Sequence, residues 1–290
     1  MELRRPILLV AFATQLALSG LAAADDALAT APSRFAMLDG IKVHYKVLGQ
    51  GSETLVLVHG WTCDLRFWRL QAASLARTRR VILVDLPGHG GSEKPEVPYT
   101  MDLFARAVES ALRAAGASKA VLAGHSMGAA VVLQFHRLFA DKTLAIVTVD
   151  GALRPFVSKP AQIEAFVGRY QGPDYKEKIA AFAEAMFPPG SPAEVVDEVK
   201  TVMTLAPQHV VVGAARGMLD PAFWTDVRIG VPLGAVMTDW EGWKGYEDYL
   251  KTIASTVEYR TVPAAGHFLM LQKPAEFLAA LESVLGALTK

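Results

Sequence analysis

Four short apolar runs, each ending abruptly at a glycine, an acid or a serine, constrain the fold of this chain more than any other feature. They read TLVLVHG from Thr54, RVILVDLPGHG from Arg80, KAVLAGHS from Lys119 and LAIVTVDG from Leu144. Runs of Val, Ile and Leu without polar alternation predict strands that are covered on both faces, as in a parallel sheet. Segments with helical spacing separate them. The alternation predicts an α/β fold with a doubly wound, mostly parallel sheet.

The ends of the chain extend this pattern. The stretch FAMLDGIKVHYKVLGQGS alternates apolar and polar residues around Asp39-Gly40, which predicts a hairpin at a sheet edge. Met101 to Ala115 has apolar residues at helical spacing and is followed by Gly116, a typical stop signal. Two later runs, VPLGAVMT and VEYRTVPAAGH, are predicted strands, and Pro274 to Leu288 is a predicted closing helix.

The rhythm breaks between Asp150 and VPLGAVMT. Residues 151–230 contain several short helical segments separated by Pro- and Gly-rich turns, and the interval is too long for a loop. We predict an inserted helical lid over 151–230 on an α/β core made of 25–150 and 231–290. We interpret its large apolar residues as mostly lid core, with a minority facing substrate: Phe156, Phe166, Tyr170, Phe182, Met186 and Phe187.

The N-terminal residues have the three-part pattern of a secretory signal peptide. A start with two arginines precedes the apolar run Pro6 to Gly20, and Ala22 and Ala24 are placed as in an Ala-x-Ala cleavage site. The alternative is a membrane anchor, but the run is shorter than the roughly 20 residues of a spanning helix. We therefore predict a signal peptide over 1–24 and an exported protein, periplasmic or secreted, without a membrane anchor after cleavage.

Charge and cysteine content narrow the partners. Lys and Arg total 29, as do Asp and Glu, so the formal net charge is zero and no basic field attracts nucleic acid. A neutral or weakly polar small molecule is the expected substrate. The single cysteine, Cys63, cannot form an internal disulfide. We interpret it as a packing residue, the alternative being a reactive thiol near the site.

One serine lies between two glycines, in Gly124-His125-Ser126-Met127-Gly128. The pattern G-x-S-x-G is that of a nucleophile elbow, a strained turn between a strand and a helix. Here KAVLA precedes the motif as a predicted buried strand, and AAVVLQFHRLF follows it as a predicted apolar helix. A serine hydroxyl becomes a strong nucleophile only with a base to take its proton and donors for the developing oxyanion.

On these motifs the chain resembles the α/β-hydrolase superfamily over nearly all of the sequence after residue 24. The matching pieces, in the family's order, are LVHGW, DLPGHGGSEKP, GHSMG and PAAGHFLMLQKPAEF. The resemblance implies that Ser126 is the nucleophile and His267 the general base. It also implies an oxyanion hole formed by the backbone N–H groups of Trp61 and Met127. We interpret His59, His89 and His125 as structural loop residues.

The carboxylate of a Ser-His-acid triad is less clearly marked. In most members of the superfamily the acid follows the strand after the lid, in a Gly-x-x-Asp turn. Here that turn reads Thr238-Asp239-Trp240-Glu241-Gly242, without a glycine before the acid. The superfamily also places the acid directly after the strand that precedes the lid, where this chain has Asp150. We predict Asp150 as the acid, with Glu241 and then Asp239 as alternatives.

A Ser-His-acid site with two N–H donors suits acyl transfer to water. We expect a serine hydrolase that cleaves a carboxylic ester or lactone through an acyl-enzyme, without cofactor or metal. A serine at this position speaks against dehalogenases and epoxide hydrolases, which use an aspartate nucleophile. A C–C bond hydrolase, a perhydrolase, a hydroxynitrile lyase or a non-catalytic ligand-binding protein of the same fold are the alternatives.

Overall fold

The computed structural model describes residues 27–288, so the predicted signal peptide lies outside the described residues. Within them, one eight-stranded sheet has the spatial order β1-β2-β4-β3-β5-β6-β7-β8. The strands are β1 (Arg34–Leu38), β2 (Ile41–Leu48), β3 (Thr54–Val58), β4 (Arg80–Val84), β5 (Ala120–His125), β6 (Thr143–Val149), β7 (Leu233–Thr238) and β8 (Val257–Val262).

The sheet is mostly parallel, as predicted. The β1–β2 hairpin turns at Asp39-Gly40 and pairs antiparallel with β4, while every pair from β4 through β3 to β8 is parallel. All residues of β3 and β5 are buried, which is why these strands are apolar on both faces. The edge hairpin instead exposes alternate residues of β1.

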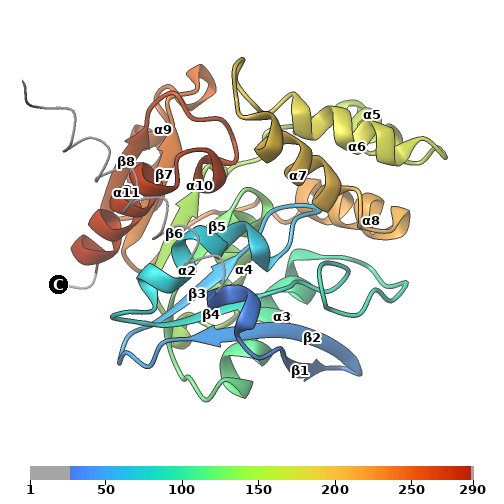
Figure 1. Ribbon diagram of the computed structural model, residues 1–290. Helices are drawn as coiled ribbons and strands as arrows, with labels where there is room; N and C mark the ends of the chain where they lie inside the picture. The colour runs from blue at the N-terminus through green and yellow to red at the C-terminus, as the bar shows by residue number, and fades with distance from the viewer. Residues whose placement is uncertain (1–26, 289–290) are drawn as a thin grey trace, which may run out of the picture.

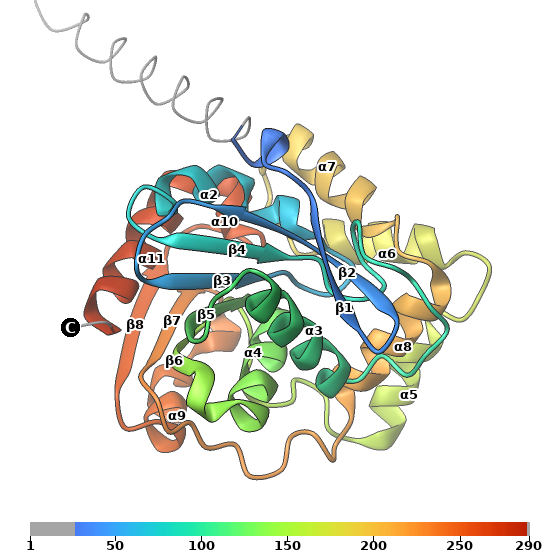
Figure 2. The same ribbon diagram turned by 90° about the horizontal axis from the view of Figure 1, so that it is seen from below.

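Helices cover both faces of the sheet. In Figure 2, α2, α10 and α11 lie on one face, and α3, α4 and α9 lie on the other. This is the doubly wound arrangement expected from the sequence. The helices, with their 3-10 turns, are η1 (Leu65–Trp68), α2 (Arg69–Leu75), α3 (Met101–Ala114), α4 (Met127–Leu138), η2 (Ala140–Lys142), α5 (Pro160–Gly168), α6 (Tyr175–Glu184), α7 (Ala193–Met203), α8 (Gln208–Leu219), η3 (Glu241–Trp243), α9 (Tyr246–Ile253), α10 (Leu269–Gln272) and α11 (Pro274–Leu288).

The helix α3 illustrates how local sequence sets these elements. The Thr100 side chain accepts a hydrogen bond from the Leu103 N–H and so caps the first turn. Phe104, Val108 and Leu112 recur at helical spacing and are buried against the sheet. Gly116, with φ of +74°, follows the last turn in a left-handed conformation that suits glycine.

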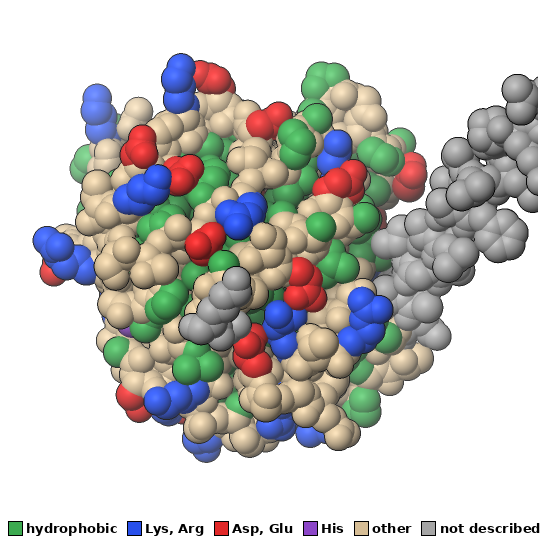
Figure 3. Space-filling model, turned by 90° about the vertical axis from the view of Figure 1, so that its left-hand side faces the viewer, with side chains coloured by type: hydrophobic (Ala, Val, Ile, Leu, Met, Phe, Trp, Pro, Cys, Tyr) green, Lys and Arg blue, Asp and Glu red, His purple; other side chains and the backbone are tan. Residues whose placement is uncertain are grey.

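Helices α5 to α8 all lie between β6 and β7 in the chain, and Figure 1 shows them gathered beside one end of the sheet. We call them the lid helices. The Trp61 indole N–H donates to the Val211 carbonyl at 3.0 Å, which joins α8 to the loop after β3. No helix among residues 27–288 has the length and apolarity needed to cross a bilayer. On the face seen in Figure 3, basic and acidic side chains are interspersed.

The parallel strands end beside one another, and their last residues bring the polar motifs together. His59 follows β3, Asp85 follows β4, Ser126 follows β5, Asp150 follows β6 and Asp239 follows β7. In open α/β sheets the crevice outside the carboxyl ends of the strands is the usual place for ligands. We therefore expect the functional site at this edge of the sheet.

Candidate active site

Ser126 occupies a strained turn between β5 and α4. Its φ of 54° and ψ of −119° lie in a region that residues other than glycine rarely adopt. The Ser126 N–H donates to the Val149 carbonyl at 3.0 Å, which holds the turn against β6. A Cβ at Gly124 would lie 2.1 Å from the Gly128 carbonyl oxygen, and one at Gly128 would lie 2.6 Å from that of Val58. The glycines of the motif are thus required by close backbone packing.

His267 lies against Asp150. The Nδ1 of His267 and Oδ2 of Asp150 are 2.7 Å apart. An ionised carboxylate only accepts hydrogen bonds, so Nδ1 carries the proton of this hydrogen bond. Burial opposes ionisation of Asp150, but the hydrogen bonds from His267 and Thr238 outweigh it and lower the pKa of Asp150 below its usual value. The arrangement leaves Nε2 as the ring nitrogen that does not bond Asp150.

The two alternative acids lie elsewhere. Glu241 is exposed and its carboxylate lies 3.6 Å from the Lys244 ammonium. Asp239 accepts the Ala264 N–H with both oxygens, at 3.0 and 3.1 Å. Among the three predicted candidates, the structure brings Asp150 to the histidine Nδ1 and places the other two apart from it.

The loop after β3 backs directly onto the serine. A Cβ at Gly60 would lie 3.0 Å from the Ser126 Cβ, a contact so tight that any side chain there would press on the serine. The next residue, Trp61, and Met127 at the start of α4 both line the cavity that Ser126 lines. Neither of their backbone N–H groups donates to another described residue. Two N–H donors therefore stand beside the serine without an acceptor in the described part of the chain.

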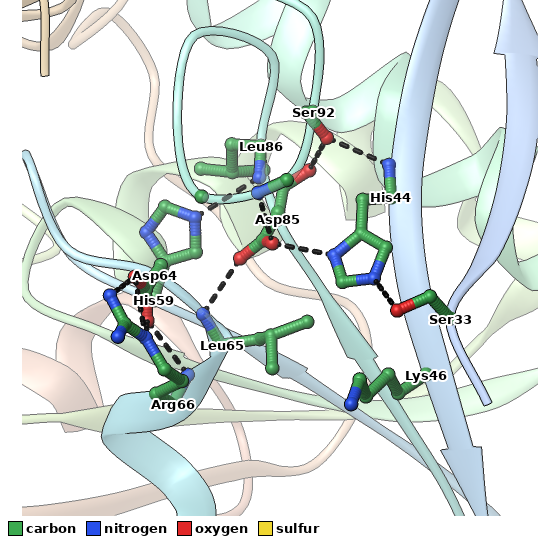
Figure 4. A network of polar contacts seen from close by, with 12 residues as sticks. Ser33, His44, Lys46, His59, Asp64, Leu65, Arg66, Asp85, Leu86 and Ser92 are labelled. Carbon is green, nitrogen blue, oxygen red and sulfur yellow. Dashed lines mark hydrogen bonds and ion pairs between the residues drawn. The ribbon is translucent and has the colours of Figure 1, made fainter. Parts of the chain in front are cut away.

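A polar network ties this loop to the one after β4, as Figure 4 shows. The His59 Nδ1–H donates to the Gly60 carbonyl at 2.8 Å, and its Nε2 accepts the Leu86 N–H at 3.0 Å. The Leu65 N–H donates to Asp85 Oδ1 at 2.8 Å. Burial lowers the pKa of His59, although the negative charge of Asp85 acts in the opposite direction. His59 is therefore a neutral brace that fixes the loop carrying Trp61.

His125 and His89 also brace loops. The His125 Nε2–H donates to the His267 carbonyl at 2.9 Å, and the His89 Nδ1–H donates to the Pro87 carbonyl at 3.0 Å. Burial, together with the neighbouring His267, lowers the pKa of His125 to about 3. Burial, together with His59, lowers the pKa of His89 to about 3 as well. Both rings are neutral near pH 7.

Ser126 and His267 face one cavity of about 660 Å³ between the sheet edge and the lid helices. Neither Ser126 Oγ nor His267 Nε2 makes a hydrogen bond to any described residue, and the two atoms are not bonded to each other. Catalytic hydrogen bonds are often long in structures without substrate and shorten when it binds. The walls are mostly apolar and include many aromatic rings and methionines: Trp61, Phe156, Phe166, Phe182, Met186, Phe187, Met203, Met218, Trp224, Trp240, Trp243 and Phe268.

The prediction that most of the large apolar lid residues form lid core was wrong. Five of the six line the cavity, and Tyr170 alone among them does not. Tyr170 is buried, with 1% exposure. The lid helices are short and pack in pairs, so their apolar faces roof the cavity instead of enclosing a separate core.

The alpha/beta hydrolase family model matches residues 55–281. This chain belongs to that family. The match begins in β3 and ends within α11, so it includes both parts of the sheet, the lid helices and every predicted site residue.

Curated relatives match this chain over shorter segments. A dihydrolipoyllysine-residue acetyltransferase component of the acetoin cleaving system from Pseudomonas putida is 36% identical over 129 residues, 44% of this chain and 35% of that protein. A soluble epoxide hydrolase from Corynebacterium is 30% identical over 135 residues, 46% of this chain and 47% of that protein. The chain thus spans less than half the length of these relatives.

Among solved structures, a thermophilic esterase from Thermogutta terrifontis matches this chain with a TM-score of 0.81. The match covers 90% of this chain and 100% of the esterase, at 24% sequence identity. Similarity at this level shows a shared fold.

Cys63 lies in the wall of the cavity that Ser126 lines, but its side chain is buried from solvent. The residue is 3% exposed, and its Sγ–H donates to the Trp61 carbonyl at 3.4 Å. Burial, with the negative charge of Asp64, raises the pKa of the Cys63 thiol well above its usual value. The thiol therefore stays protonated, as the packing interpretation requires. Within residues 27–288, no group of three or more His, Cys, Asp or Glu could hold a metal ion.

Sequence reasoning missed the groups that surround Asp150. Thr238 donates to its Oδ1 through both the backbone N–H, at 3.2 Å, and the hydroxyl, at 2.9 Å. The Trp243 indole N–H donates to the same oxygen at 2.8 Å. These residues lie 88 and 93 positions from Asp150, and no local pattern marks them.

Proposed function

We propose that this α/β-hydrolase is a serine hydrolase that cleaves a carboxylic ester or lactone through an acyl-enzyme. One observation carries the proposal: the His267 imidazole is held by Asp150 at 2.7 Å and lines the same cavity as Ser126. The two unengaged N–H groups of Trp61 and Met127 in that cavity support it. A nucleophile, an oriented base and oxyanion donors are the parts that acyl transfer requires.

The proposed reaction has two halves. Ser126 Oγ attacks the substrate carbonyl carbon while His267 Nε2 takes the hydroxyl proton, and the N–H groups of Trp61 and Met127 hold the oxyanion. Collapse breaks the bond to the leaving oxygen, which receives the proton from His267. A water molecule then attacks the carbonyl carbon of the acyl-serine while His267 takes a proton from it. The bond to Ser126 Oγ breaks, Oγ receives that proton from His267, and the acid is released. Asp150 stabilises the imidazolium in both halves.

The cavity favours an apolar, neutral or weakly polar substrate. Its walls carry many aromatic rings and methionines, and methionine side chains adapt to ligands of varied shape. A serine stands where an epoxide hydrolase needs a carboxylate nucleophile, which favours ester or lactone cleavage over epoxide opening. None of the proposed steps requires a cofactor.

The test is hydrolysis of chromogenic esters and a panel of lactones by the wild-type protein and two variants. We expect Ser126→Ala and His267→Ala each to lower turnover by at least ~10³-fold with the fold intact by circular dichroism. The double variant should be little worse than either single one, because both residues serve one step. The exposed Ser118→Ala is the matched control and should leave turnover unchanged.

Two results would contradict the proposal. The first is no turnover of any ester or lactone by the wild-type protein. The second is turnover that survives in Ser126→Ala, since the acyl-enzyme cannot then form on this residue.

A further inference from the structure

We propose that Trp243 and Thr238 are positioning residues, which fix the Asp150 carboxylate so that only Oδ2 is presented to His267. The expected effects of this positioning on turnover rest on the proposed function, whereas the fixed orientation of the Asp150 carboxylate does not. The two residues donate three hydrogen bonds to Oδ1, at 2.8, 2.9 and 3.2 Å. His267 Nδ1 lies 2.7 Å from Oδ2.

A buried carboxylate needs this many donors. Asp150 is 5% exposed, so water cannot complete the solvation of its charge. Burying an ionised group is costly unless hydrogen bonds compensate it. Three donors on Oδ1 and one on Oδ2 satisfy the two oxygens unequally. The carboxylate is therefore locked in one orientation, since a turn about its last torsion would break all three bonds at Oδ1.

The donors come from a rigid source. Thr238 is the last residue of β7, a strand that pairs with β6 through Val149 and Val236. The Asp150 N–H itself donates to the Val236 carbonyl at 3.0 Å. The acid and its first donor thus stand at the ends of two neighbouring strands, whose ladder fixes their separation.

The second donor is held by aromatic packing. The Trp243 ring lies with its centroid 4.8 Å from that of Tyr246 and 5.5 Å from that of Trp240. The buried Tyr246 hydroxyl donates to the Gly151 carbonyl at 3.2 Å and accepts the Leu153 N–H at 2.7 Å. One tyrosine therefore supports both the indole donor and the chain that follows Asp150.

The backbone at Asp150 shows why such support is needed. Its φ is +39°, a conformation that a residue other than glycine holds only when its surroundings impose it. The bonds to Thr238 and Trp243 oppose relaxation of that strain. Without them the carboxylate is free to turn, and the direction in which His267 is held becomes variable.

The decisive variant is Trp243→Phe, which keeps an aromatic ring in the cavity wall but removes the N–H donor together with part of the indole. We expect kcat for a chromogenic ester to fall about tenfold while KM changes less than about threefold, because the lost bond orients the base rather than the substrate. Tyr249→Phe is the matched control. It removes a hydroxyl donor from the same aromatic cluster, outside the cavity wall, and that hydroxyl bonds the Leu153 carbonyl and not Asp150, so both constants should stay unchanged.

A pH profile separates positioning from a general loss of structure. A carboxylate with fewer donors attracts the imidazolium more strongly, so the acid limb of kcat/KM should move to higher pH in Trp243→Phe. The titratable groups in contact with His267 are Asp150 and His125, whose ring centroid lies 4.7 Å away. The Arg154 guanidinium also lines the cavity and lies over the Tyr246 ring. Because the pKa of His125 is about 3, His125 stays neutral over this limb. Asp239 also lines the cavity, but its carboxylate accepts the Ala264 N–H.

A spectroscopic readout is independent of catalysis. The proton between Asp150 and His267 should give a low-field proton resonance that shifts in Trp243→Phe and is absent in Asp150→Asn. Thr238→Val should act in the same direction as Trp243→Phe, and Thr238→Ser should restore the wild-type profile by returning the hydroxyl. In an Asp150→Asn background, Trp243→Phe should have no further effect.

The inference is overturned if Trp243→Phe matches Tyr249→Phe in kcat, acid limb and proton resonance. It is also overturned if Trp243→Phe lowers kcat equally in the presence and absence of the Asp150 carboxylate. If the wild-type protein hydrolyses no ester, the proposed function fails, and the resonance still decides the positioning role.

Discussion

At the residue scale, the position of one carboxylate decides how the site is built. Asp150 directly follows β6 and contacts a histidine 117 positions later in the chain. The turn after β7 carries two acids, yet it contributes hydrogen-bond donors to Asp150 instead of a carboxylate to His267. The carboxylate that contacts His267 therefore follows β6, while the residues that donate hydrogen bonds to it lie at the end of the adjacent strand β7 and in the turn after it.

The corresponding prediction compares two amides. Asp150→Asn should leave the fold in place and lower ester turnover by about 10²–10⁴-fold, because the histidine loses its charge partner and its preferred tautomer. Glu241→Gln should change turnover by less than about tenfold, or roughly 1.4 kcal/mol of barrier, since Glu241 is exposed and distant from Nδ1. Steady-state kinetics on one ester would reveal the reverse order if Glu241 were the acid.

At the element scale, the turn from β5 into α4 depends on close packing of backbone against backbone. A Cβ built on Gly124 in β5 would meet the carbonyl oxygen of Gly128 in the first turn of α4. That oxygen belongs to the backbone and cannot move aside as a flexible side chain could. The strand and the helix can meet at this angle only if position 124 has no side chain. The strain at Ser126 is held in place by the same contacts.

We expect Gly124→Ala to lower the free energy of unfolding by at least about 2 kcal/mol, because the added methyl overpacks a rigid site. Turnover of the folded fraction should fall as well, since the serine shifts with the turn. Gly286→Ala is the control: a Cβ there, in the last turn of α11, meets nothing within 4 Å. That change should raise stability by at most about 0.5–1 kcal/mol. Urea unfolding of both variants measures the contrast.

At the scale of the whole molecule, buried histidines couple folding to pH. His89 and His125 are buried, and burial lowers the pKa of each to about 3 from an ordinary value of 6.5. The unfolded chain therefore binds more protons than the folded one between these values, and stability must fall as pH falls through that range. The pKa of His59 is lowered by burial too and adds in the same direction.

Each of these two rings is expected to cost about 2 kcal/mol of stability at pH 5, so the pair should cost about 4 kcal/mol relative to pH 7. Urea unfolding at the two pH values measures the loss. The lowered pKa values of Asp85 and Asp150 affect stability only as the pH falls to the ordinary Asp value of 3.8 and below, which is outside this window. His89→Asn should remove about half of the dependence. A stability independent of pH between 5 and 7 would contradict burial of neutral rings.

Local sequence determined most of this architecture. Runs such as TLVLV and the glycines around Ser126 specify a buried strand and a tight elbow through their own packing needs, without reference to distant residues. The order of the motifs then placed Ser126 and His267 on the same edge, because the carboxyl ends of parallel strands meet there. The same local signals left three carboxylates open and misjudged which lid residues face the cavity.

Only the tertiary structure decided those points. Which acid reaches His267 depends on the distance between strand ends that lie far apart in the chain, and on whether Thr238 and Trp243 can satisfy the charge of Asp150. Which lid side chains line the cavity depends on how four short helices pack over the sheet edge. Both are set by contacts between residues dozens of positions apart, and periodicity or a motif records only the interactions of near neighbours along the chain.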